Sequence, residues 1–312
     1  MLWEAGLIYV NYLLLFFMLL VSVAFVTLVE QKVLGSTQVR VGPNYVGYFG
    51  VFQPFSDAVK LFGKESVSLT EGNFFMYYVA PIMSLSLTLF LWVIFPFKEG
   101  GLLFSYGLLF FVCVSGVMVY PILMMGWSSN CKYSVMGSLR AVAQMISYEV
   151  SLAVVFLSVI WMSGGFDLKL LMNSQACIWN LLLFFPLSLV WFGSSLAETN
   201  RSPYDFSEGE SELVSGFNTE YSSVGFTLIF ISEYGNILFM GVLFTILFLG
   251  NSMSGLMVLK SLMLVFIFIW VRGTMPRYRY DKLMNLAWKS FLPISLMFFI
   301  FYLNLGESCS YF

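Results

Sequence analysis

Two acidic residues, Glu149 and Glu233, lie inside apolar stretches that are long enough to cross a membrane. Each stands about ten residues into its predicted span, roughly 15 Å from the start at the helical rise of 1.5 Å per residue. A carboxyl group in hydrocarbon is costly unless it is neutral, paired or wet. Two such groups at similar depth could approach each other and form a buried proton relay. The simpler alternative is a protonated side chain bonded to a neighbouring hydroxyl or carbonyl group.

A second group of acids lies in the polar connection between the fifth and sixth predicted spans. Six of the 17 acidic residues fall within 23 residues there, opposed by the single Arg201: Glu198, Asp205, Glu208, Glu210, Glu212 and Glu220. Such crowding raises the pKa values of carboxyl groups, so some of these residues should exchange protons near neutral pH. A solvated acidic loop is the simpler interpretation, but interleaved apolar residues such as Phe217 favour a loop folded against the protein.

Composition identifies the elements that must position these residues. Of the 312 residues, 59% are hydrophobic and 10% charged, far less charge than the roughly 25% of soluble domains. We therefore expect an all-α integral membrane protein, with a single membrane domain over residues 1–312. Each span needs about 20 apolar residues, and the pattern predicts about eight: 6–29, 74–96, 102–125, 140–163, 176–197, 223–249, 254–271 and 287–305. Lys260 interrupts the seventh, which either tilts or lets this side chain reach an interface.

Basic residues are distributed unequally between the two faces of this predicted domain. One face holds only Lys98 and Lys169. The opposite face holds twelve basic residues: Lys32, Arg40, Lys60, Lys64, Lys132, Arg140, Arg201, Arg272, Arg277, Arg279, Lys282 and Lys289. By the positive-inside rule the rich face is cytoplasmic or faces a mitochondrial matrix, and both termini lie opposite. The abundance of Phe (34) and Met (18) fits a small AT-rich organellar genome, which favours the mitochondrial alternative.

Two segments on the basic face are amphipathic or strongly charged. Residues 53–64 place Phe55 on an apolar helical face and Asp57 on a polar one, which predicts a short helix lying in the membrane interface. This helix could be a simple anchor. The segment 272–282 contains four basic residues, and binding to lipid phosphates explains them adequately. Beside an acidic loop, they could also be its counter-charge.

Several kinds of site have no sequence support. The four cysteines are scattered without a CxxC motif and histidine is absent, so an iron–sulfur cluster or a His-ligated haem lacks its usual ligands. Neither a GxGxxG nor a GxxxxGK[ST] motif occurs, and no metal site is expected. The net charge of -2 gives no reason to expect a nucleic-acid partner. If the chain serves redox chemistry, another subunit must transfer the electrons.

The polar segments resemble subunit 1 of respiratory NADH:quinone oxidoreductase (complex I), and the match runs over most of the chain. The most specific stretches are 141–149, 197–205 and 208–218, supported by 42–44, 53–55, 60–62 and 276–281. The resemblance implies a core membrane subunit of a proton-pumping NADH:ubiquinone oxidoreductase in the mitochondrial inner membrane. Such a subunit is part of an enzyme but does not catalyse alone.

The resemblance also implies two groups of functional residues. A quinone chamber would involve Glu30, Arg40, Phe55, Asp57, Phe230, Arg272 and Arg277. Coupling to proton movement would involve Glu149, Glu198, Asp205, Glu208, Glu210, Glu212, Glu220 and Glu233. Ubiquinone would be the substrate, and flavin and iron–sulfur clusters would lie in partner subunits. The implied partners are peripheral-arm subunits at the quinone site, small membrane-arm subunits and membrane lipid.

Two departures and two alternatives accompany this assignment. Gln31 and Val41 stand where the family usually has basic residues, so roles of those cations do not transfer to this chain. Intramembrane carboxylates would also suit a secondary ion transporter, although no internal repeat in the sequence supports this alternative. A membrane anchor of an energy-converting hydrogenase would share the fold without a quinone site, but the long interfacial loop argues against it.

Overall fold

The computed structural model describes residues 2–67, 72–102, 104–176, 178–206, 209, 214–250 and 255–310. Over these residues the only regular elements are helices, which confirms the predicted all-α class. In chain order they are α1 (Leu2–Thr37), η1 (Tyr48–Gly50), α2 (Gln53–Gly63), α3 (Phe74–Trp92), α4 (Gly107–Val117), α5 (Val119–Ser128), α6 (Lys132–Ser163), α7 (Leu168–Ser174), α8 (Asn180–Leu183), α9 (Phe185–Glu198), η2 (Gly216–Asn218), α11 (Ser223–Phe244), η3 (Thr245–Leu249), α12 (Gly255–Thr274), α13 (Tyr280–Leu286), η4 (Ala287–Phe291) and α14 (Leu292–Ser310).

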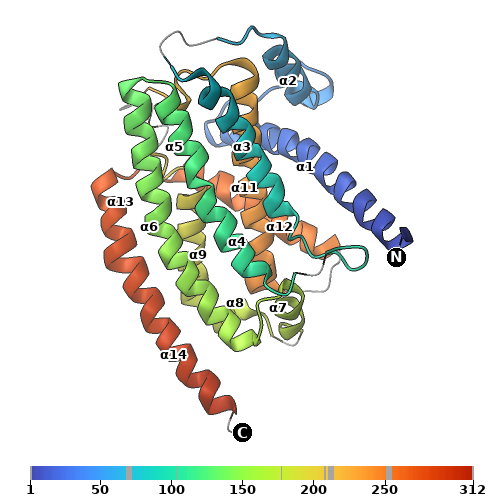
Figure 1. The fold of residues 1–312 in the computed structure, drawn as a ribbon, viewed down its shortest axis with the longest axis vertical. Helices are drawn as coiled ribbons and strands as arrows, with labels where there is room; N and C mark the ends of the chain where they lie inside the picture. The colour runs from blue at the N-terminus through green and yellow to red at the C-terminus, as the bar shows by residue number, and fades with distance from the viewer. Residues whose placement is uncertain are drawn as a thin grey trace.

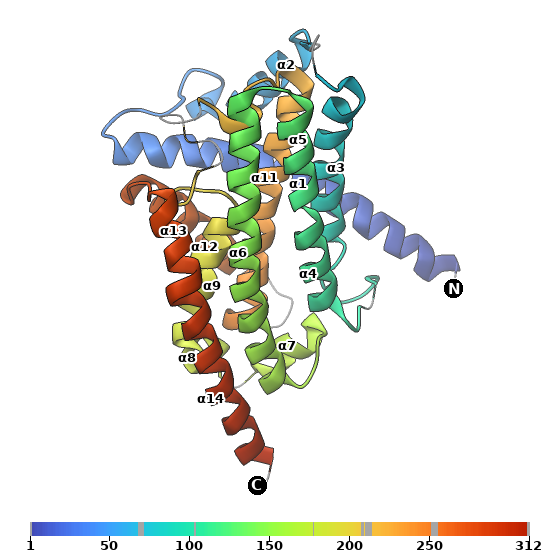
Figure 2. The same ribbon diagram turned by 60° about the vertical axis from the view of Figure 1, so that its left-hand side comes forward.

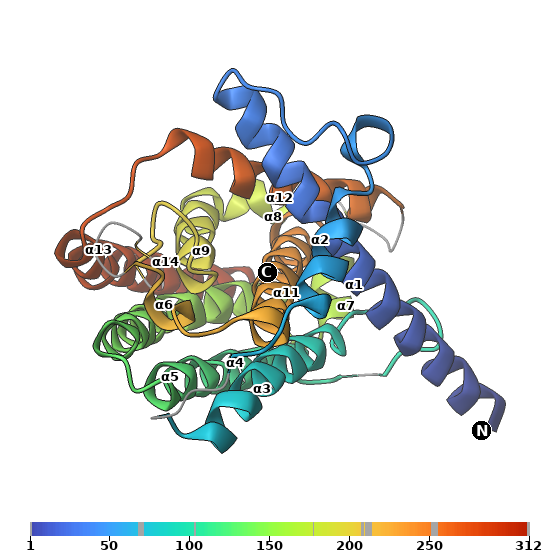
Figure 3. The same ribbon diagram turned by 90° about the horizontal axis from the view of Figure 1, so that it is seen from above.

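Helix α11 lies near the centre of the bundle when it is viewed from above (Figure 3). It packs against α1, α3 and α12, and 72% of its most apolar stretch is buried inside the protein. The corresponding stretch of the segment that ends in α14 is only 17% buried, and α14 runs down the outside of the bundle (Figure 1). Helix α1 crosses the bundle steeply relative to α5 and α6 (Figure 2). Residues on α11 are therefore the best shielded from the surroundings.

Seven helical segments in the described part of the chain are long and apolar enough to cross a membrane: Gly6–Thr37, Phe74–Trp92, Gly107–Ser128, Lys132–Ser163, Ser223–Leu249, Gly255–Thr274 and Tyr280–Ser308. The predicted continuous span 176–197 needs correction, because the chain breaks at Phe184 into the short α8 and the 14-residue α9. Pro186 explains the break. It lacks an N–H group and fits the first turn of a new helix better than the interior of a continuous one.

Two further boundaries differ from the sequence prediction. Helix α6 begins at Lys132 rather than at residue 140, so Glu149 lies 17 residues (roughly 26 Å) from its start. Glu233 lies 10 residues (roughly 15 Å) after Ser223, the first residue of α11. Counted from their helix starts the two carboxyl groups are therefore not equivalent, and a common depth below the basic face stays a prediction. Hydropathy located the apolar part of α6 but not its polar first turns.

The predicted amphipathic helix is present as α2, at the end of the molecule opposite α7 and α8 (Figure 1). Pro54 stands in its first turn, where a missing N–H group costs nothing. The helix packs against α1 and α11. Phe55 meets Phe25 of α1 edge to face, with 6.1 Å between the ring centroids. Helix α2 is therefore fixed to the two helices that hold Glu30 and Glu233.

Small residues set the position of the η2 turn against α6. A Cβ atom added at Gly137 would lie 2.9 Å from the Cα of Gly216 and 3.0 Å from the backbone nitrogen of Phe217. Both neighbours are backbone atoms, so no side chain can rotate away. Ser134 of α6 is completely buried beside this contact, and its hydroxyl reaches the carbonyl oxygen of Phe217. The loop after the acidic segment is therefore folded onto α6, as its apolar residues predicted.

We expect Gly137→Ala to destabilise the folded protein by about 1–3 kcal/mol, the usual cost of overpacking a tight interior. Gly63→Ala is the matched control, because a Cβ atom there meets nothing within 4 Å. The measurement is the midpoint temperature of unfolding of the protein extracted from its membrane in mild detergent. Equal midpoints for the two variants would contradict the close backbone contact.

Candidate functional site

The end of α9 directs the polar side chains of Glu198, Asn200 and Arg201 into the centre of the bundle. Asn200 has a positive φ of 50°, a conformation that Asn tolerates better than most residues. Its N–H group donates to the Ala197 carbonyl, and the N–H group of Arg201 donates to the Leu196 carbonyl. This pair of bonds is a Schellman motif, which satisfies the last carbonyl groups of the helix. It fixes the directions of the side chains at positions 198, 200 and 201.

Gln144 of α6 fastens this helix end from the side. The Nε2 atom of Gln144 donates to the carbonyl oxygens of Ala197 at 2.7 Å and Tyr204 at 2.9 Å. A completely buried carboxamide that bonds to two backbone carbonyl groups holds both at a fixed distance from α6. The turn that contains Arg201 is consequently positioned by α6 as well as by α9.

Arg201 is the centre of a cluster of buried charged groups. Its guanidinium lies 3.7 Å from Glu30 Oε1 of α1 and 3.8 Å from Glu233 Oε2 of α11. It also lies over the ring of Tyr234, 4.3 Å from the ring centroid. Glu30 accepts further hydrogen bonds from the Tyr234 hydroxyl and from Arg272 of α12. Three helices, α1, α11 and α12, and the turn after α9 therefore meet at one network of two arginines, two carboxylates and a tyrosine.

Burial makes this network energetically important. The side chains of Arg201 and Glu30 are only 13% and 6% exposed. A charge removed from water needs a close counter-charge and hydrogen bonds to offset lost solvation. Glu30 has two arginines and a phenol around it, and Arg201 has two carboxylates. Because each partner depends on the others, the cluster constrains how α1, α9, α11 and α12 pack.

A second ion pair joins the loops that precede α13 and follow α9. Arg277 Nη2 lies 3.2 Å from Asp205 Oδ2, and the Tyr278 N–H group donates to the Pro203 carbonyl at 3.1 Å. The rings of Tyr204 and Tyr278 stack, with centroids 5.6 Å apart. Burial raises the pKa of Tyr204 to about 12, so its phenol stays neutral in this contact. The basic segment is thus a counter-charge to part of the acidic loop.

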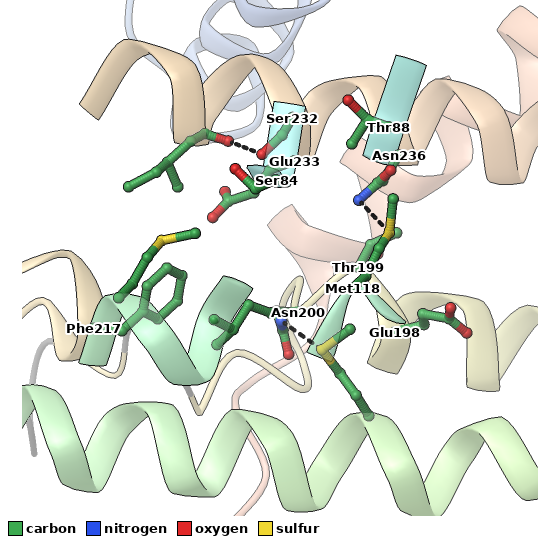
Figure 4. Close-up of a pocket in the computed structure, with 14 residues that line it drawn as sticks. Ser84, Thr88, Met118, Glu198, Thr199, Asn200, Phe217, Ser232, Glu233 and Asn236 are labelled. Carbon is green, nitrogen blue, oxygen red and sulfur yellow. Dashed lines mark hydrogen bonds between the residues drawn. The ribbon is translucent and has the colours of Figure 1, made fainter. Parts of the chain in front are cut away.

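A polar cavity lies beside the cluster, between α3, α5, α6, α11 and the end of α9 (Figure 4). Its volume is about 50 Å³, and roughly 10–15 Å³ suffices for one water molecule. The cavity therefore has room for a few waters. Its polar lining residues are Ser84, Thr88, Glu198, Thr199, Asn200, Ser232, Glu233 and Asn236. Glu198 and Glu233 are brought to one cavity, although they are 35 residues apart in sequence.

Glu149 lies on the other side of Glu198. Its Oε1 atom accepts a hydrogen bond from the Ser115 hydroxyl of α4 at 3.3 Å. A Cβ atom at Gly116 would stand 3.1 Å from the same oxygen, so this glycine leaves room for the carboxyl group. The carboxyl groups of Glu149 and Glu198 are also close enough to interact electrostatically. Glu198 therefore stands between Glu149 and the cavity that Glu233 lines.

The other predicted quinone-site residues differ in how close they lie to the Arg201 cluster. Phe230 of α11 is half-buried and stacks on Tyr234, with ring centroids 6.3 Å apart. Asp57 of α2 accepts a hydrogen bond from Gln53, one turn earlier. Arg40 is exposed, and its side chain donates to Gln38 on the same loop. The structure therefore places Phe230 against the cluster, whereas Arg40 lies out on the loop.

The acidic loop is described only in part. Glu220 lies at the C-terminal end of the loop, where its backbone carbonyl accepts a hydrogen bond from the Tyr77 hydroxyl of α3. The predicted residues Glu208, Glu210 and Glu212 lie outside the described residues.

Sequence reasoning missed several members of the site. Arg201 was noted only as the single cation among six acids, and Tyr234 was not singled out although it follows Glu233 directly. Asn200 and Asn236 gave no signal beyond being amides near predicted acids. An unbalanced cation in an acidic segment was the one available sign, because a buried arginine needs several carboxylates.

Comparisons with known proteins give a consistent family. A model described as NADH dehydrogenase matches residues 10–303. The NADH-ubiquinone oxidoreductase chain 1 of Locusta migratoria is 53% identical over 307 residues, which cover 98% of each chain. The protein of the same name from Aedes aegypti is 53% identical over 293 residues, 94% of each chain. That from Phascolarctos cinereus is 49% identical over 311 residues, 96% of this chain and 97% of its own.

We expect Arg201→Met to destabilise the folded protein by about 3–5 kcal/mol, because it leaves Glu233 and Glu30 without their shared counter-charge. Arg279→Met is the control, since Arg279 and Asp281 form an ion pair whose side chains are 77% and 67% exposed. That change should cost at most about 1 kcal/mol. The midpoint of thermal unfolding in mild detergent measures both. Similar shifts for the two variants would contradict a central role of the Arg201 cluster in packing.

Proposed function

The chain belongs to the NADH dehydrogenase family and is a multi-pass subunit of a respiratory NADH–ubiquinone oxidoreductase, and we propose that it couples quinone reduction to proton translocation. In this proposal one part of the site forms a wall of the quinone chamber. Another part is an acidic path that responds to the chemistry there. The observation that supports it best is the position of Arg201, at nearly equal distances from Glu30 and Glu233.

The quinone chamber would lie where α1, α2, α11 and α12 approach one another. Aromatic side chains of Phe55 and Phe230 offer apolar contacts to a quinone ring and its tail, and both belong to helices that pack together. Arg272 and Glu30 supply charge at the inner end. Asp57, Arg40 and Arg277 would form the charged outer part of the chamber. A hydrophobic substrate at membrane depth would thus meet a polar terminus, which is the arrangement that small-molecule sites usually have.

Quinone reduction and proton movement would be coupled by changes of charge at this chain's side chains. The chain itself would carry no electrons. Reduction of a quinone by two electrons gives an anionic species until two protons are taken up, so the charge near Glu30 and Arg272 would change transiently during turnover. Because Arg201 contacts carboxylates on both sides, a change at Glu30 alters how strongly the guanidinium stabilises Glu233. The proton affinity of Glu233 then follows the state of the substrate. Electrons would come from flavin and iron–sulfur clusters in partner subunits.

Protons would move from the Arg201 cluster along a row of carboxyl groups. Glu233 and Glu198 line one cavity, and Glu198 interacts with Glu149. The described acidic residues Asp205 and Glu220, with Glu208, Glu210 and Glu212, would form the outer opening of this path. The basic face would point to the mitochondrial matrix and dock peripheral-arm subunits, and both termini would lie on the intermembrane-space side. Small membrane-arm subunits and lipid would cover the apolar faces.

We expect Arg272→Lys to raise the KM for quinone by about tenfold, because Lys cannot reproduce the planar, multiply bonded contact of a guanidinium. NADH oxidation by an artificial acceptor at the flavin should not change. Arg279→Lys is the control on the same face, since over the described residues Arg279 forms its ion pair with the exposed Asp281. Steady-state kinetics on membranes with the assembled complex provide the test. An unchanged KM in Arg272→Lys would argue against a chamber at this position.

For the acidic path, we expect Glu149→Gln and Glu233→Gln to depress both quinone-linked turnover and proton translocation, by roughly 10²-fold or more if each residue transfers protons directly. Flavin-site NADH oxidation should stay nearly intact. Glu99→Gln is the matched control, because Glu99 is exposed on the loop between α3 and α4. Proton uptake by reconstituted vesicles, measured together with quinone reduction, decides the matter. Normal pumping in both variants would reduce these two residues to a structural role.

A further inference from the structure

The cavity between Glu198 and Glu233 contains three buried oxygen atoms that the proposed mechanism does not yet explain. They are Oε2 of Glu198, Oδ1 of Asn200 and Oδ1 of Asn236. None of them accepts a hydrogen bond from the part of the chain that the structure describes. All three residues line the same cavity. Buried acceptors of this kind nearly always have a partner, either a protein group or an ordered water.

The two carboxamides are oriented by weak contacts on their nitrogen sides. Asn236 Nδ2 lies 3.6 Å from the sulfur of Met118, and Asn200 Nδ2 lies 4.0 Å from the sulfur of Met145 (Figure 4). A thioether is a weak acceptor but cannot donate, so it selects the NH₂ side of each amide. The oxygen side then faces away from the sulfur. Helix α6 provides one of these sulfurs, and the junction between α4 and α5 provides the other.

The backbone supports the same placement. Asn200 occupies the left-handed position of the Schellman motif, so its side chain projects from the end of α9 in a fixed direction. Asn236 is three residues after Glu233 on α11, and residues three apart share a helix face. Asn200 is two residues after Glu198. Asn200 is therefore placed beside Glu198, and Asn236 beside Glu233, in the lining of the cavity.

We propose that Asn200 and Asn236 are positioning residues whose carboxamide oxygens hold water between the carboxyl groups of Glu198 and Glu233. This proposal rests on the proton-coupling role proposed above and assigns the link between its two acids. The cavity volume of about 50 Å³ is enough for a few waters. A water that donates one hydrogen to an amide oxygen still has a second hydrogen for a carboxylate. The asparagines thereby orient the water without exchanging protons themselves.

The test uses the assembled complex in native membranes and removes each carboxamide with little disturbance of the backbone. Asn236→Leu substitutes an apolar side chain of similar shape on a helix, and Asn200→Gly suits the positive φ of that position. Asn11→Leu is the matched control, because Asn11 also lies on a helix but bonds to the Gly100 carbonyl outside the cavity.

We expect both cavity variants to retain flavin-site NADH oxidation while quinone-linked turnover falls by about tenfold, less than the roughly 10²-fold or more typical of a direct proton donor. The KM for quinone should stay the same. The solvent deuterium isotope effect on turnover should rise, because proton transfer becomes rate-limiting. Asn236→Gln, which keeps a carboxamide, should restore most of the turnover, and Asn11→Leu should behave like the unmodified protein. If Asn236→Leu fails to assemble, Asn200→Gly and Asn236→Gln still give the comparison.

A double variant separates this proposal from the function on which it rests. Asn236→Leu combined with Glu198→Gln should be no slower than Glu198→Gln alone, because both interrupt one water path. Multiplicative losses, or an unchanged isotope effect in both asparagine variants, would overturn the positioning role and leave the role of Glu198 intact. Full turnover and pumping in Glu198→Gln would instead overturn the proposed proton path itself.

Discussion

The structure depends on the requirement that a buried guanidinium be surrounded by negative and aromatic groups. Arg201 is 13% exposed and has contacts to Glu30, Glu233 and the ring of Tyr234. These partners come from helices at the beginning and toward the end of the chain. Without them the charge would be too costly to bury. The apolar helices could pack in many ways, but only an arrangement that closes this network satisfies the arginine.

The C-terminal end of α9 sets the geometry of the candidate site. The Schellman motif after α9 determines where residues 198, 200 and 201 point, and Gln144 holds the motif against α6. The same turn therefore places one residue in the ion-pair cluster and two in the neighbouring cavity. In the proposed function, a charge change at the cluster and a proton in the cavity would be separated by one turn of backbone. This proximity would be the physical basis for the proposed coupling, since electrostatic influence falls off with distance and dielectric.

The sequence predicted the components of this site better than their arrangement. Hydropathy identified Glu149 and Glu233 as acids within apolar helices, and amphipathic spacing identified α2. The break at Phe184 was missed, because a window of apolar residues does not register a helix interruption caused by Pro186. The partners of Arg201 were also missed. Apolar periodicity shows which segments are buried, whereas the relative height of neighbouring helices is set by side-chain contacts between them.

The position of Glu198 changes how the proposed proton relay would work. Two carboxyl groups at one depth could exchange a proton directly, but here Glu198 stands between the other two acids. In a row of three carboxyl groups, the middle one must both accept and release protons. A permanent counter-charge beside it would hold it ionised. Glu198 meets this condition within the described part of the chain, because its buried Oε2 atom has no hydrogen-bond partner there and the acidic Glu149 is its charged neighbour. In the proposed row, Arg201 would stabilise charge at one end, and the middle group would be free to change its protonation state.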